Sequence, residues 1–183
     1  MESYFNFGPE KERRHVPYAL VLFLPAVLDD LIAPIREKYD PVYSQMPAHI
    51  PLVFPFKTTR SLDDLASVIT DEMRLHRAIT VEMDSIGDFY PGSPVIYWSA
   101  MPNETLNELY YSLYSRLEIP IPFKKFKPHV VVAREVSSHR VLIVKEAIVS
   151  SLSQEKFTAD AVDLVTPLMD NKWVSVRTFS LAE

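Results

Sequence analysis

Cysteine is absent from the 183-residue chain, and glycine occurs only three times. Without cysteine the chain can form no disulfide and no cysteine zinc site, and it has no thiol nucleophile. The scarcity of glycine excludes glycine-rich phosphate loops, because the chain contains neither a GxGxxG nor a GxxxxGK[ST] pattern. These absences fit a reducing cytoplasm, and they exclude sites that are built on a glycine-rich phosphate loop.

Positive charge is in the minority, with 19 Lys and Arg against 24 Asp and Glu, for a net charge of −5. Coating of a nucleic acid needs a broad basic face, so we expect no broad nucleic-acid surface. A local basic pocket stays compatible with this balance. Apolar residues make up 48% of the chain and charged residues 23%, which is typical of a globular domain with a real core.

A hydrophobic run long enough to span a membrane is also lacking. Residues 11–28 have a basic start and an apolar centre, as a signal peptide does, but Pro25 interrupts the run and Asp29 and Asp30 follow at once. We therefore expect a buried first strand and no membrane contact. We expect a flexible N-terminal extension over residues 1–15, then one bilobal domain over 16–183, as a monomer in the cytoplasm.

Proline, with fifteen residues, is abundant and predicts stiff turns. Hydrophobic periodicity and capping residues predict helices over 26–40, 61–76, 103–117 and 137–152. Alternating or continuous apolar runs predict strands over 16–24, 49–54, 78–90, 94–100, 129–134, 155–167 and 172–181. Pro34 should kink or end the first helix. This order predicts an α+β fold with a mostly antiparallel sheet, organised as two similar halves.

Two stretches, "PAHIPLVFPF" (47–56) and "KPHVVVAR" (127–134), carry candidate chemistry. His49 and His129 each begin a strand after a proline-rich connection. If each half contributes one central strand, the two histidines can meet across a cleft. A histidine pair suits phosphodiester chemistry, because neutral imidazole is a general base and protonated imidazole is a general acid.

This arrangement resembles the two-histidine (2H) phosphoesterase superfamily, which includes 2′-5′ RNA ligase-like proteins and cyclic phosphodiesterases. The resemblance covers about residues 16–181, and "VPYALVLFLP" and "NKWVSVRTFSL" look like that family's opening and closing strands. It implies a bilobal α+β fold with two pseudo-symmetric lobes around a central cleft. It also implies chemistry on 2′,3′-cyclic or 2′-5′ phosphate linkages without metal or cofactor, with a nucleotide or RNA-terminus phosphate as the ligand.

The chain departs from the family pattern of His, an apolar residue, then Thr or Ser, whose hydroxyl donates to the phosphate. Pro51 and Val131 stand at these positions, and neither side chain can donate a hydrogen bond. The loss of one preorganised donor to a developing oxyanion costs about 3–4 kcal/mol. Pro51 also lacks a backbone N–H, which predicts a sheet edge or a bulge at this point.

Basic residues near the two motifs could supply charge in place of the hydroxyls. Lys127 shares a strand face with His129, and Lys57 and Arg134 stand near the ends of the two strands. Strand parity puts Arg134 on the far face unless the strand ends there. Lys124 and Lys125 make the preceding loop basic, which favours an anionic ligand.

Three hypotheses remain open from the sequence. The first is a phosphoesterase in which His49 and His129 exchange base and acid roles. The second is a non-catalytic relative that keeps the cleft as a nucleotide-binding module. The third is a plain α+β protein with coincidental histidines. His15, His76 and His139 have no comparable context, and we expect no functional role for them.

Overall fold

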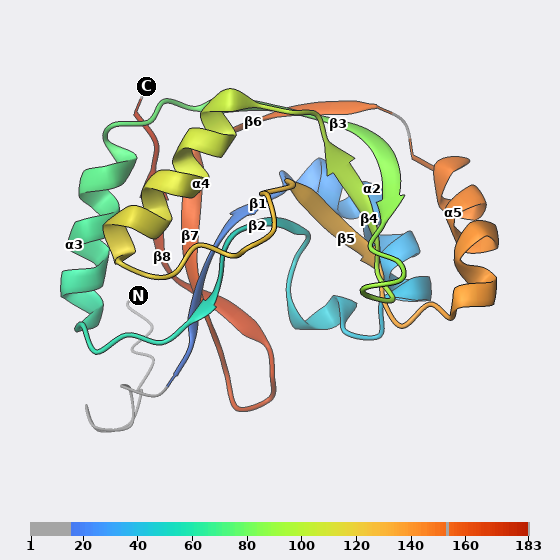
Figure 1. Cartoon of the computed structure of the whole chain (residues 1–183), viewed down its shortest axis with the longest axis horizontal. Coiled ribbons are helices and arrows are strands. Elements are labelled where there is room, and N and C mark those ends of the chain that lie inside the picture. Colours follow the sequence, from blue (N-terminus) through green and yellow to red (C-terminus); the bar gives the residue numbers. More distant parts are fainter. Residues whose placement is uncertain (1–15, 153, 183) are drawn as a thin grey trace.

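Two four-stranded antiparallel sheets form the framework of the protein (Figure 1). The computed structural model describes residues 16–152 and 154–182, so the predicted extension over 1–15 lies outside the described residues. The first sheet has the order β2-β1-β7-β8, with β1 Tyr18–Phe23, β2 His49–Phe56, β7 Ala161–Pro167 and β8 Trp173–Ser180. The second sheet has the order β5-β4-β3-β6, with β3 Ile79–Asp88, β4 Ile96–Ala100, β5 His129–Ala133 and β6 Glu155–Ala159.

Two of the helices tie the lobes together, because each packs on the sheet of the other lobe. The helices are α2 Ala26–Tyr39, α3 Leu62–Met73, α4 Glu104–Leu117 and α5 Val141–Val149. Helix α2 follows β1 of the first sheet but packs on β5 of the second, and α4 follows β4 of the second sheet but packs on β2 of the first. Helix α3 packs on α4 and β8, and α5 packs on β3. The order β1-α2-β2-α3-β3 is thereby repeated as β4-α4-β5-α5-β6, which confirms the two similar halves.

The predicted N-caps are present at the two helices that cover the first sheet. The Ser61 hydroxyl accepts a hydrogen bond from the backbone N–H of Asp64 at 3.1 Å, and Asn103 caps α4 through the N–H of Leu106 at 3.0 Å. Among the described residues, no helix is long and apolar enough to cross a lipid bilayer.

Helix α2 does not end at Pro34, as the sequence suggested it could, but continues to Tyr39. Pro34 is exposed, and the carbonyl that loses its helical partner belongs to the exposed Asp30. Water can satisfy that carbonyl, so the cost of an interior proline is reduced. Burial of Leu28 and Ile32 on the opposite face stabilises the whole helix.

The single strand predicted over 155–167 is wrong, because the structure divides it between the two lobes. Strand β6 pairs with β3 in the second sheet, and after Asp160 the chain enters the first sheet as β7, between β1 and β8. The apolar pattern continues through both strands, so only the long-range pairing separates them. The predicted helix over 137–152 is also shorter, a 3-10 turn at Ser138–Arg140 followed by α5, in keeping with its β-branched residues.

Candidate active site

Strands β2 and β5, which begin with the two histidines, are edge strands of their sheets and lie against each other. Their pairing with neighbouring strands is alike. Pro51 lies opposite Val21 and Val131 opposite Tyr97, and in each strand the next residue is an unpaired bulge residue. The edge position and the bulge predicted from Pro51 are therefore both present.

A cavity of about 480 Å³ lies where these two strands meet. Its lining residues include His49, Pro51, His129, Val131 and Arg134. Both sheets contribute to the cavity, so residues 80 positions apart in the chain share one space. The two positions at which the family pattern has a hydroxyl thus line the cavity and present only apolar side chains.

Both histidine rings are fixed in the same tautomer by the backbone. Nδ1 of His49 donates to the carbonyl of Pro47 at 2.8 Å, and Nδ1 of His129 donates to the carbonyl of Lys127 at 2.6 Å. A carbonyl can only accept, so Nδ1 carries the hydrogen in each ring. When the ring is neutral, the lone pair is then on Nε2, which is the state that a general base requires.

The surroundings of both histidines favour the neutral ring. Burial lowers the pKa of His49 to about 4. The hydrogen bond to Pro47 acts in the opposite direction and raises the pKa, whereas the nearby charges of Arg36 and Arg134 lower it further. Burial also lowers the pKa of His129, with the charges of Lys127 and Arg134 acting in the same direction. Both rings are therefore neutral at pH 7, and an anion bound beside one of them would favour protonation of that ring.

Aromatic rings surround His129. Phe89 and Tyr97 both meet its imidazole edge-on, with centroid distances of 5.0 and 5.2 Å. The Lys127 ammonium donates a hydrogen bond to the Tyr97 hydroxyl and lies over the same ring. Tyr97 can take this position because residue 87 is glycine, since a Cβ there would lie 2.5 Å from the Tyr97 ring. The close approach of β3 and β4 thus fixes a buried ring that packs against His129.

A cluster of three charged residues also lines the cavity, and the sequence analysis singled out only one of them, Arg134. Asp40 lies 3.6 Å from Arg36 Nη2 and 3.2 Å from Arg134 Nε, so one carboxylate is shared between two guanidinium groups. Arg36 is 6% exposed, and its Nη2 also donates to the carbonyls of Tyr43 and Met46. The Arg134 side chain is 37% exposed, so it is the guanidinium that a ligand can reach from solvent.

One signal for Arg36 was present in the sequence. Leu28, Ile32 and Arg36 follow one another at a spacing of four, so the apolar face of α2 ends in a charge. A charge on a buried helix face is rarely left without a partner. The carboxylates that pair with Arg36, Asp29 and Asp40, come from the two ends of α2, and the approach of Arg134 from beyond β5 to share Asp40 depends on the tertiary fold.

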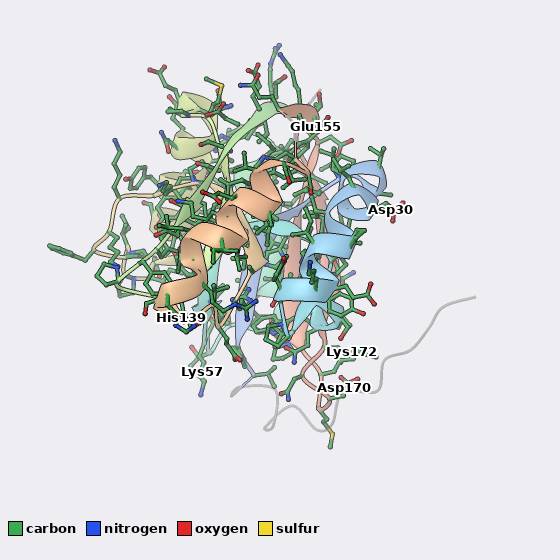
Figure 2. All side chains as sticks on the ribbon, turned by 90° about the vertical axis from the view of Figure 1, so that its right-hand side faces the viewer. Asp30, Lys57, His139, Glu155, Asp170 and Lys172 are labelled. Carbon is green, nitrogen blue, oxygen red and sulfur yellow. The ribbon has the colours of Figure 1, made fainter. Side chains whose placement is uncertain are left out.

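The other predicted cations lie in different places. Arg134 follows the last residue of β5, Ala133, and it lines the cavity because the strand has ended. Lys127 reaches Tyr97 at the side of His129. Lys57 is exposed just beyond β2 and is not among the cavity-lining residues (Figure 2). The structure therefore brings Arg134 into the cavity and Lys127 to the side of His129, outside the cavity lining, and it leaves Lys57 away from both histidines.

Two antiparallel lobes, each contributing one strand-leading histidine to a shared cavity, define a protein of the two-histidine phosphoesterase class. The sequence profile described as "2'-5' RNA ligase superfamily" matches residues 24–171, and the chain belongs to this superfamily.

Similar proteins cover nearly the whole chain. A Bacillus licheniformis protein whose name proposes a phosphoesterase is 29% identical over 167 residues, which cover 90% of this chain and 98% of that protein. A Bacillus pumilus protein with the same kind of name is also 29% identical over 167 residues, which cover 91% of this chain and 98% of that protein.

The crystal structure of Escherichia coli LigT complexed with 3′-AMP has a TM-score of 0.69 at 17% identity, covering 92% of this chain and 99% of LigT. LigT has also been crystallised with phosphate, and this structure has a TM-score of 0.64. At this identity the likeness to LigT shows a shared fold.

Proposed function

We propose that the protein is a phosphoesterase that hydrolyses 2′,3′-cyclic or 2′-5′ phosphodiester linkages of nucleotides or RNA ends. The observation that carries this proposal is the histidine pair. His49 and His129 come from two lobes, line one cavity and have the same hydrogen bond at Nδ1. Two imidazoles can supply both proton transfers of such a reaction without a metal or a cofactor. The lack of cysteine fits a role in a reducing cytoplasm.

The two histidines have different neighbours, which suggests a division of roles in hydrolysis. His49 has the pKa of about 4 and stays neutral, so its Nε2 takes a proton from the attacking water. The water oxygen forms a bond to phosphorus while the bond to the leaving ribose oxygen breaks. His129, protonated when the anionic phosphate binds, gives its proton to that leaving oxygen.

Cations supply part of the charge that the phosphate needs. Arg134 lines the cavity and its side chain is partly exposed, so it is the main candidate for contact with a phosphate oxygen. Lys127 adds charge beside His129. The complexes of LigT with 3′-AMP and with phosphate support a nucleotide or phosphate ligand for this fold.

A second candidate function is a nucleotide-binding module with impaired turnover. Pro51 and Val131 line the cavity where hydroxyl donors are needed, and neither can stabilise a developing charge. The cavity, the cations and the histidines would still bind a nucleotide phosphate.

The two functions are separated by hydrolysis of 2′,3′-cyclic nucleotides and 2′-5′ dinucleotides in the presence of a chelator. If the protein is an enzyme, His49→Ala and His129→Ala should each lower kcat/KM by about a hundredfold or more. His139→Ala is the matched control, because His139 is exposed and lies outside the cavity. Unchanged activity in both cavity variants would contradict the proposal. Nucleotide binding that needs His49 and His129, without turnover, would favour the binding module.

A further inference from the structure

The connection between α4 and β5, residues 119–128, leads directly into His129. Its sequence is "IPIPFKKFKP", and Pro120, Pro122 and Pro128 restrict its backbone. Phe126 attaches it to α4 by stacking on Tyr110 with a centroid distance of 4.0 Å and an interplanar angle of 15°. Figure 1 shows this yellow-to-orange segment running from the end of α4 across to β5. We call residues 119–128 the rim loop.

The rim loop presents an aromatic ring and two lysines to solvent. Phe123 has a relative exposure of 106%, and Lys124 and Lys125 are also exposed. Within the part of the chain that the structure describes, neither lysine has a carboxylate partner. Phe123 gains nothing from packing in the free protein, and the ring together with the two lysines beside it is available to a ligand.

The rim loop borders the cavity on the side of His129. A Cβ placed on Gly92 would lie 3.9 Å from Lys124 Nζ, so Lys124 extends to the turn that contains Gly92. Phe89 and Ser93, on either side of that turn, line the cavity. Lys127 lies over Tyr97 beside His129. Lys127 and Lys124 thus lie beside residues that neighbour the cavity, although neither lysine lines it.

The charge of this edge contrasts with the chain as a whole. Three lysines fall within four residues of the rim loop, although the net charge of the chain is −5. Asp88 is paired with Lys145 at 2.7 Å, which is the main cause of its lowered pKa, and the charge of Lys127 adds to that effect. The rim loop therefore offers local positive charge beside one exposed ring.

We propose that the rim loop is a subsite for the polynucleotide part of an RNA end whose terminal phosphate occupies the cavity. Phe123 stacks on a base next to the reacting nucleotide, and Lys124 and Lys125 contact the phosphates that precede it. Aromatic stacking combined with cations is the general basis of single-strand binding, and it tolerates any base sequence. The inference rests on the proposed function and narrows its substrate from nucleotides in general to RNA strands.

Calorimetric binding of two ligands tests the inference: uridine 3′-monophosphate, and a six-residue oligouridylate that ends in a 3′-phosphate. The wild type should bind the oligomer about tenfold more tightly than the monomer. The variant F123A/K124Q/K125Q should lose this preference, while its affinity for the monomer changes less than twofold. The slope of log K against log salt for the oligomer should fall by about 1.4, because two lysines no longer displace counterions.

A control variant, L142A/K156Q/R74Q, makes the same kinds of change at exposed residues on α5, on β6 and after α3. It should keep the wild-type preference for the oligomer, and thermal unfolding should show that both triple variants are folded. Equal wild-type affinity for the two ligands, or no effect of the rim-loop changes, would overturn this inference and leave the proposed function standing. Dimerisation that Phe123→Ala abolishes would also overturn it, because a second copy would then be the partner of this ring. If neither ligand binds the wild type, the proposed function fails and this inference fails with it.

Discussion

Residue 131 is one of the two cavity positions at which this chain lacks the hydroxyl of the family pattern. Val131 pairs with Tyr97 across the sheet and lines the cavity two residues after His129. Pro51 has the equivalent place in the other lobe, opposite Val21. Threonine has nearly the shape of valine and adds a hydroxyl donor, so a single substitution can test what the missing donor costs.

We expect Val131→Thr to raise kcat for a 2′,3′-cyclic nucleotide about a hundredfold, because it adds a donor to the developing charge on phosphate. Pro51→Thr in addition should raise it further. Steady-state hydrolysis measures both effects. Val131→Ala is the control for a change of volume without a donor, and an equal effect of Ala and Thr would show that the hydroxyl is not what the site lacks.

At the scale of elements, the close approach of β3 and β4 fixes the ring that packs against His129. Gly87 pairs with Tyr97, whose ring lies against His129 and Lys127. The position of the ring therefore depends on a glycine in the neighbouring strand. The glycine has no chemical role of its own, but any side chain at this position must displace the ring.

We expect Gly87→Ala to lower the free energy of unfolding by about 1–3 kcal/mol, because its Cβ would lie 2.5 Å from the Tyr97 ring. Catalysis should fall as well, since the ring supports His129. Urea unfolding and kcat/KM measure the two effects. Gly92→Ala is the matched control, because its Cβ would meet only Phe89 O at 3.3 Å and Lys124 Nζ at 3.9 Å. Equal stability of the two variants would contradict the role given to Gly87.

For the whole molecule, burial of two neutral histidines makes stability depend on pH. The pKa of His49 is about 4 in the folded protein and about 6.5 in the unfolded chain, and the pKa of His129 is also lowered by folding. Between these values the unfolded chain binds more protons than the folded protein. The contribution of the two neutral rings to the free energy of unfolding is therefore fully present above pH 6.5, and it is lost as the pH falls toward 4.

We expect the His49 shift alone to lower the free energy of unfolding by up to about 3 kcal/mol between pH 7 and pH 4. Urea unfolding at a series of pH values measures the slope. His49→Gln should reduce this slope between pH 6.5 and 4.5. Folding lowers the pKa values of Glu72 and Asp88, so these two carboxylates change the free energy of unfolding mainly below that pH range. A slope in His49→Gln equal to that of the wild type would refute the assignment.

The sequence predicted the parts of the site that follow from local rules. His49 and His129 were placed at strand starts, the lack of an N–H at Pro51 predicted an edge or a bulge, and Arg134 was expected near the cavity only if its strand ended. Strand parity, proline geometry and helix capping act over a few residues, so one sequence is enough to apply them.

By itself, then, the sequence predicted the α+β class, the repeated order of helices and strands, and a histidine at the start of each of two strands, because each has a short-range pattern. Only the tertiary structure decided that Asp40 is shared by Arg36 and Arg134, that Gly87 admits the Tyr97 ring, and that β6 and β7 belong to different lobes. These features depend on pairing and packing between segments far apart in the chain. Such contacts form wherever burial and hydrogen bonding are best satisfied together, and no local pattern encodes that choice.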